Sequence, residues 1–269
     1  GDVYKRQGLA LAGVALQAVF GNPLAEPGLI GVSSGAAVGA ATATVLGTAA
    51  GLSGVLGGVL SVFASSWAIA VSAFIGGAVA TAIVAANAHG GRDIARIILV
   101  GVAVNSICGG LVSLLTFVAS TAARDRIVFW QMGSFASATW TQVVIITLVT
   151  VPAVIAMWVS YRKLDILSLG EAQARHLGIN VVTLRRAIIF GTSLVVAAGV
   201  AFSGIIVFIG LVVPHAARLL LGPAHRTLIP ACILGGALAT TLADLAARTM
   251  ITGADLPLGM LTSIVGGPL

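Results

Sequence analysis

The chain has 269 residues, of which 58% are hydrophobic and only 8% carry a charge. Soluble globular domains have about 25% charged residues, so this composition excludes that class. The formal net charge of +6 comes from basic residues in short loops between long apolar runs. This pattern is typical of a multi-span membrane protein and gives no reason to expect a nucleic-acid partner.

The apolar runs predict membrane helices in chain order. Residues 8–20 are too few to cross a bilayer, which takes about 20, so we expect the second half of a helix there, after a non-native tail at residues 1–7. Spans are predicted at 28–51, 59–86, 94–120, 142–161, 187–203 and 228–247, with a shorter helix at 205–221 and another starting at 258. Residues 8–269 should therefore form one all-α polytopic transmembrane bundle of about eight helices, truncated at both ends.

Residues 162–186, called the polar segment below, interrupt this pattern with seven of the chain's 14 basic and 8 acidic residues. Such a segment cannot lie in hydrocarbon, so it should lie in water or against another protein. Good helix formers predict a short helix at 168–177, with Ser168 as its N-cap. Glu171 and Arg175 can pair on one face of that helix, and an ordinary solvated loop helix is the alternative interpretation.

The basic residues also predict an orientation. Cytoplasmic loops of membrane proteins carry an excess of Lys and Arg. If the polar segment is cytoplasmic, the basic residues in or beside cytoplasmic loops are Arg92, Arg96, Arg162, Lys163, Arg175, Arg185, Arg186, Arg218 and Arg226, against Arg124, Arg126 and Arg248 outside. This asymmetry favours a cytoplasmic polar segment.

Three further stretches are candidates for function. The turn after residue 21 contains two prolines and ends in Ser33-Ser34, which predicts an N-cap for the next helix, where Gly35 and Gly39 favour close helix contact. Asp244 and Arg248 are predicted to form a structural ion pair near an outer helix end, with a substrate-path role as the alternative. An interfacial anchor, or a contact with an anionic substrate or binding protein, is predicted for Arg124, Arg126, Phe129 and Trp130.

Several motifs carry a resemblance to a known family. They are NPLAEPGLIGVSSGA at 22–36, LGEAQARHLG at 169–178, FIGLVVPH at 208–215, LAD with Arg248 at 242–248, and LPLG at 256–259. In this order and spacing the chain resembles the FecCD-type permeases, the membrane subunits of bacterial ABC importers for vitamin B12, haem and ferric siderophores. That family has ten helices, and the resemblance extends from about residue 8 to 269.

The resemblance implies a homodimer in the cytoplasmic membrane, two ATP-binding cassette subunits and an extracytoplasmic substrate-binding protein. ATP and Mg²⁺ would bind the partner subunit, since this chain lacks a GxxxxGK[ST] loop, and no catalytic residue, cofactor or metal is expected here. ATPase coupling is implied for Leu169, Gly170, Glu171, Ala174, Arg175, Leu177 and Gly178, with Leu169, Ala174, Leu177 and Gly178 packing into the partner. A cytoplasmic gate is implied for Asn22, Pro23, Leu24, Asp93, Ile94 and Ala95.

The substrate is predicted to be haem or another iron chelate, because the string FWQMGSF at 129–135 looks closer to the haem branch. A cobalamin permease is the alternative within the family. An ion-coupled secondary transporter is the alternative from another class. It would need charges at the membrane midplane, where the predicted helices are nearly free of them.

Overall fold

The computed structural model describes residues 3–48, 65–87, 94–135, 139–250 and 256–267, with side chains from Gly8 onward. Within these ranges the secondary structure is helical and contains no strand, which confirms the predicted all-α class. The helices are α1 (Val3–Phe20), the 3-10 turn η1 (Pro27–Ile30), α2 (Val32–Thr48), α4 (Ser66–Asn87), α5 (Ile94–Val118), α6 (Thr121–Met132), α7 (Trp140–Val159), α8 (Tyr161–Ser168), α9 (Glu171–His176), α10 (Val181–Ser203), α11 (Ile209–Leu221), α12 (His225–Thr249) and α13 (Leu258–Gly266).

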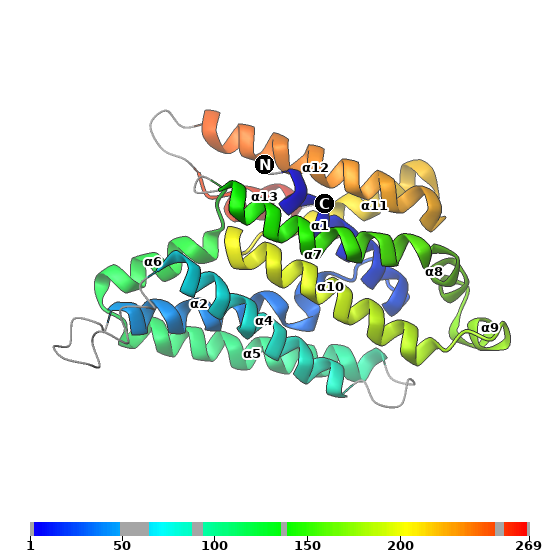
Figure 1. The fold of residues 1–269 in the computed structure, drawn as a ribbon, viewed down its shortest axis with the longest axis horizontal. Coiled ribbons are helices and arrows are strands. Elements are labelled where there is room, and N and C mark those ends of the chain that lie inside the picture. Colours follow the sequence, from blue (N-terminus) through cyan, green and yellow to red (C-terminus); the bar gives the residue numbers. More distant parts are fainter. Residues whose placement is uncertain (1–2, 49–64, 88–93, 136–138, 251–255, 268–269) are drawn as a thin grey trace.

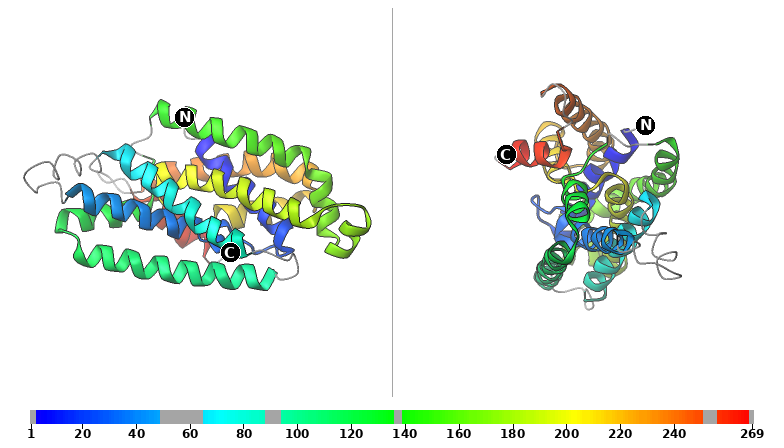
Figure 2. Two further views of the ribbon diagram at one scale, coloured as in Figure 1. Left: turned by 60° about the horizontal axis from the view of Figure 1, so that its bottom comes forward. Right: turned by 90° about the vertical axis from the view of Figure 1, so that its left-hand side faces the viewer.

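The long helices run roughly along one axis, as expected for a membrane bundle (Figure 1, Figure 2). Of the described helices, α4, α5, α7, α10 and α12 are long and apolar enough to cross a membrane, whereas residues 8–20, α2 and α11 are apolar but shorter. The predicted bundle of apolar helices is thus present. Of the predicted tail, residues 1 and 2 lie outside the described residues, and the backbone from Val3 onward is helical.

The centre of the bundle is α1, which contacts α7, α10, α11 and α12. Its side chains from Leu9 to Phe20 are buried almost without exception. A helix that is apolar and buried on all sides belongs to a core and not to a lipid-facing surface. By contrast, α5, α7 and α12 bury under a third of their apolar windows, so their outer faces are free to meet lipid or another chain.

Small residues set the contact between α2 and α4. A Cβ atom at Gly39 would overlap the carbonyl oxygen of Ser72, and one at Gly35 would overlap that of Gly76. Only glycine allows two backbones to approach this closely. The structure therefore uses the predicted Gly35 and Gly39 pair as a helix-packing surface.

Two ends of the bundle differ in character. In Figure 1, α8 and α9 lie at one end with the turn between α11 and α12, whereas α6 lies at the opposite end, where it contacts α13 and α2. The sequence places the polar segment and the loop with Arg226 on one side of the membrane and the stretch with Arg124 on the other, and the structure has them at opposite ends in the same way. The predicted loops at 51–58 and 89–93 lie outside the described residues.

Candidate coupling and gate sites

The polar segment folds as two short helices, not one. The predicted helix start at Ser168 is wrong, because Ser168 is the last residue of α8 and its hydroxyl donates to the carbonyl of Leu164 at 2.9 Å. Gly170 separates α8 from α9 with a φ of 124°, a conformation that favours glycine. Leu164 and Leu167 are buried, and α8 contacts α1 and α12, so α8 is anchored to the bundle.

The second short helix, α9, is tied to α10 by charge. Glu171 pairs with Arg175 at 3.2 Å and also accepts a hydrogen bond from Nη2 of Arg185. Arg185 is only 3% exposed and lies in α10, which begins at Val181 with Asn180 accepting from the Thr183 N–H at 3.1 Å. The sequence predicts a loop charge at Arg185 and does not indicate this contact. An arginine five residues after the N-cap Asn180 was the available signal.

A second polar contact ties α8 to α12. Oδ1 of Asp165 lies 2.8 Å from the backbone N of His225 and 2.7 Å from its Nδ1. His225 is buried at the first position of α12, where the sequence predicts only a polar turn residue. Asp165 and His225 are 60 residues apart in the chain, so nothing local in the sequence indicates that they meet.

The outward side of the polar segment exposes two leucines. Leu169 is 71% exposed and Leu177 is 65% exposed, on either side of α9. Gly178 is exposed as well, whereas Gly170 and Glu171 are half-buried. The prediction that Ala174 packs into a partner is wrong, because Ala174 is fully buried within this chain, where the inner face of α9 meets the bundle.

The turn that carries the candidate gate residues is re-entrant. Asn22, Pro23 and Leu24 are exposed, and Oδ1 of Asn22 accepts from the Leu24 N–H at 2.9 Å. After them the chain turns into the bundle, where the carbonyl of Gly28 accepts from Nδ2 of Asn105 at 3.0 Å. Asn105 is the twelfth residue of α5, about 16 Å along the helix from its start. Non-helical backbone at such depth persists only where it is packed against protein or lines a cavity.

The second group of candidate gate residues lies at the start of α5. Ile94 is half-buried and Ala95 exposed as its first two residues, and Asp93 lies outside the described residues. No hydrogen bond between described residues joins Ile94 or Ala95 directly to the Asn22 turn. The two groups of gate residues are connected through α5, which starts at Ile94 and donates from Asn105 to the Gly28 carbonyl of the turn.

Asn105, Ser34 and Glu26 hold the re-entrant turn. The sequence predicts no role for Asn105 or Glu26, and predicts Ser34 only as part of an N-cap. Ser34 donates to Oδ1 of Asn105 at 2.7 Å from inside α2, so the predicted N-cap at Ser33-Ser34 is wrong and α2 begins at Val32, after η1. Glu26 accepts from the backbone N–H of Phe208 at 3.2 Å. Phe208 is the N-cap of α11, with a φ of 67°, and is the one non-glycine residue with positive φ in the described chain. The signal for Asn105 was a lone amide in an apolar run.

At the opposite end, α6 splits the predicted aromatic and basic cluster. Arg124, Arg126 and Phe129 are exposed, whereas Trp130 turns inward and packs against the core. Nε of Arg124 donates to the carbonyl of Thr116 at 3.2 Å, which fixes α6 to the end of α5. Arg248 lies 3.2 Å from Asp244, one helical turn away on α12.

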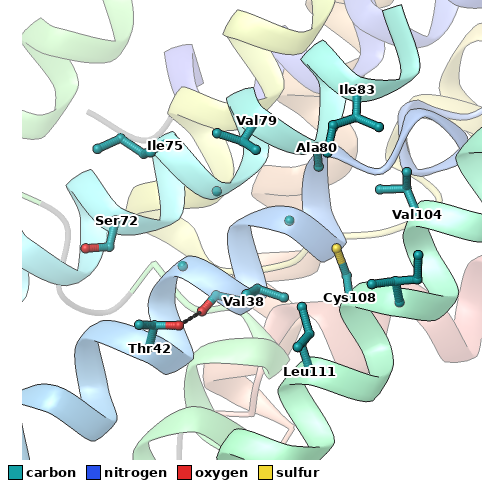
Figure 3. A pocket seen from close by; sticks show the side chains of 14 residues that line it. Val38, Thr42, Ser72, Ile75, Val79, Ala80, Ile83, Val104, Cys108 and Leu111 are labelled. Carbon is teal, nitrogen blue, oxygen red and sulfur yellow. Dashed lines mark hydrogen bonds between the residues drawn. The ribbon is translucent and has the colours of Figure 1, made fainter. Parts of the chain in front are cut away.

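A groove of about 460 Å³ lies between α2, α4 and α5 (Figure 3). Its walls are mainly aliphatic, with Thr42 and Ser72 as polar members, and the buried Cys108 also lines it. The hydroxyl of Thr42 donates to the Val38 carbonyl at 2.8 Å, so its proton is already used within α2. Among the described residues no group of three His, Cys, Asp or Glu side chains gathers to suit a metal ion.

A helical membrane bundle with non-helical backbone packed at mid-depth is an arrangement common among membrane transporters. The chain belongs to the FecCD transport family, whose family model matches residues 7–269.

Named relatives agree with this family. The chain is 38% identical over 261 residues to the hemin transport system permease protein HmuU of Yersinia pestis, covering 97% of this chain and 75% of that protein. It is 37% identical to the vitamin B12 import system permease protein BtuC of Escherichia coli, covering 97% and 76%. The structure resembles a metal-chelate type ABC transporter solved in an inward-facing conformation, with a TM-score of 0.87, 33% identity, and 99% and 80% coverage.

Proposed function

We propose that the chain is the membrane permease subunit of an ATP-driven importer in the cytoplasmic membrane, carrying haem or another iron chelate such as a ferric siderophore. The observation that carries this proposal is the family match over nearly the whole chain, together with the named permease relatives. ATP hydrolysis takes place in a separate ATP-binding cassette subunit, and an extracytoplasmic binding protein delivers the substrate.

In this proposal the polar segment is the docking site for the ATPase. Leu169 and Leu177 are exposed on a part of the chain too charged to lie in lipid, so a protein surface is the partner that would bury them. Gly170 and Gly178 provide the turns on either side of α9. The Glu171–Arg175 pair is half-exposed and contributes about 0–1 kcal/mol, so it orients α9 more than it adds to binding.

The re-entrant turn would act as the gate. Asn22, Pro23 and Leu24 are exposed at its tip, and Asp93, Ile94 and Ala95 would form the second gate element. At the other end, Arg124, Arg126 and Phe129 would contact the binding protein or an anionic substrate. The Asp244–Arg248 pair would hold the outer helix ends together, and Trp130 would contribute through packing.

Two copies of the chain would form the translocation path. The exposed apolar faces of α5, α7 and α12 supply surface for lipid and for a second copy. Cross-linking of single-cysteine variants on these helices in membranes tests the homodimer. A cross-linked pair along one helix supports it, whereas labelling without any cross-linked dimer contradicts it.

The substrate test must separate haem from cobalamin, because the identities of 38% and 37% to the two relatives hardly differ. The permease is reconstituted in proteoliposomes with its ATPase and binding protein and given haem, a ferric siderophore or cyanocobalamin in turn. ATP-dependent uptake of haem or the siderophore supports the proposal. Uptake of cyanocobalamin alone supports the alternative.

The same vesicles separate an ABC importer from a secondary transporter. Uptake that requires ATP and survives an uncoupler supports the importer. Uptake that needs no ATP and stops with an uncoupler supports the secondary transporter, for which the half-buried Glu26 would be the first residue to examine.

A further inference from the structure

The polar segment is joined to the bundle by two polar contacts that lead to different helices. Asp165 of α8 bonds the start of α12, and Glu171 of α9 bonds Arg185 of α10. Neither contact uses the exposed leucines proposed to meet the ATPase. The two contacts therefore serve this chain's own architecture.

The contact at α12 is a helix cap supplied from a distant part of the chain. Ala224 occupies the N-cap position of α12 and has no side chain that can cap it. Oδ1 of Asp165 takes that role, accepting from the His225 N–H at 2.8 Å, while His225 Nδ1 lies 2.7 Å from the same oxygen. The first N–H groups of a helix lack partners within the helix and favour a negative charge. The start of α12 is thus fastened to α8.

The contact at α10 places α9. This helix has only six residues and no side-chain cap, and Ala174 is its one buried residue. Isolated helices of this length are not stable in water. The hydrogen bond between Glu171 and the buried Arg185 is therefore a directional contact that fixes α9 relative to α10, whereas the Glu171–Arg175 pair lies within α9 and cannot tie it to another helix.

We infer that Asp165 and Arg185 are positioning residues that fasten the two halves of the polar segment to α12 and α10, so that a displacement of α9 moves both helices together. Both helices contact the central α1, which leads into the re-entrant turn. A push on the polar segment thus has a short physical route to the proposed gate. This inference rests on the proposed function.

The test uses the permease reconstituted with its ATPase and binding protein, with haem as probe, or cyanocobalamin if only that is imported. Asp165→Ala and Arg185→Gln remove the contacts, whereas Asp165→Asn and Arg185→Lys keep an acceptor or a charge. Arg226→Gln and Arg186→Gln are the matched controls, because each removes an exposed charge one residue away from His225 or Arg185.

The first measurement is substrate imported per ATP hydrolysed. Loss of a hydrogen bond to a charged group should lower this ratio about ten-fold in Asp165→Ala and Arg185→Gln, with ATP hydrolysis changed less than about two-fold. The conservative variants should recover part of the ratio, and the controls should match wild type.

The second measurement is amide hydrogen exchange of the permease in detergent, which keeps the inference falsifiable if a variant assembles poorly. Asp165→Ala should speed exchange at the start of α12, and Arg185→Gln should speed exchange in α9 only. Faster exchange with an unchanged ratio overturns the inference, because the contacts would then be structural alone. An equal fall of substrate imported per ATP hydrolysed in Arg226→Gln and Arg186→Gln would also overturn the inference.

Failure of the proposed function is distinguishable from failure of the inference. Wild-type vesicles that import nothing on ATP hydrolysis reject the proposed function, and the inference falls with it. If wild-type vesicles import substrate on ATP hydrolysis and the variants show the same ratio of substrate imported to ATP hydrolysed, only the inference is rejected.

Discussion

Replacing Asn105 with leucine should loosen the re-entrant turn from the bundle. The variant removes two hydrogen bonds, from Asn105 Nδ2 to the Gly28 carbonyl at 3.0 Å and from the Ser34 hydroxyl to Asn105 Oδ1 at 2.7 Å. Side-chain hydrogen bonds between membrane helices average about 0.6 kcal/mol and reach about 1.7. Since the Gly28 carbonyl is left without that partner at depth, we expect a loss of about 1–3 kcal/mol in the free energy of unfolding.

The two buried cysteines provide the assay. Cys108 lies three residues after Asn105 on α5, whereas Cys232 lies on α12, and both are buried. Labelling by a fluorogenic maleimide during a thermal ramp in detergent reports opening near each cysteine, using Cys232→Ala and Cys108→Ala backgrounds. Asn105→Leu should lower the labelling temperature of Cys108 more than that of Cys232, because the turn opens before the rest of the bundle.

Ser106→Ala is the matched control, since the Ser106 hydroxyl donates only to Val102 within α5 and its side chain is exposed. A double-mutant cycle with Ser34→Ala isolates the shared contact. Equal labelling temperatures for Asn105→Leu and Ser106→Ala would refute the reasoning. Strict additivity of Ser34→Ala and Asn105→Leu would show that the pair does not interact.

Three further predictions concern separate contacts, two of them with a matched control substitution. Gly39→Leu should prevent α2 from packing on α4 and lower the free energy of unfolding by about 1–3 kcal/mol or abolish folding. Gly109→Leu should be tolerated, because no heavy atom lies within 4 Å of a Cβ at that position. Monodispersity in detergent distinguishes the two variants. Glu26→Ala should destabilise by about 1–3 kcal/mol because the Phe208 N–H loses its acceptor, and Glu26→Gln, which keeps an acceptor, should not, as thermal unfolding would reveal. Leu177→Asp should leave the melting temperature nearly unchanged but abolish co-purification of the ATPase, and retained co-purification would contradict docking through the exposed leucines.

The order of the apolar helices in the described residues could be predicted from the sequence because hydrocarbon imposes a length on each apolar run. The predicted boundaries failed where side chains bond across the fold. The predicted span at 28–51 is broken at Gly31, because Asn105 and Glu26 satisfy a turn inside the bundle. The span predicted from residue 187 begins at Val181. Asn180 caps the helix, and Arg185 within it forms an ion pair with Glu171.

The candidate sites divide in the same way. Motif and polarity suffice to find the polar segment, but not to decide which of its residues face inward. Ala174 and Leu177 are both apolar residues of α9 or its end, yet Ala174 is fully buried and Leu177 is 65% exposed. The helical turn that separates them, and the start of α9 at Glu171 instead of Ser168, set this difference. Contacts such as Asp165 with His225 span 60 residues and need the tertiary structure.

These contacts bear on how such a bundle can change shape. Lipid tails are as apolar as leucine, so sliding an outer helix exchanges protein contact for lipid contact at little cost. The central α1 and most of α10 have no such exchange available, because protein surrounds them. Apolar packing thus separates a rigid centre from movable outer helices but does not determine which of those helices move together. We infer that directional bonds do. Asp165 with His225 joins α8 to α12, Glu171 with Arg185 ties α9 to the central α10, and Asn105 joins α5 to the re-entrant turn.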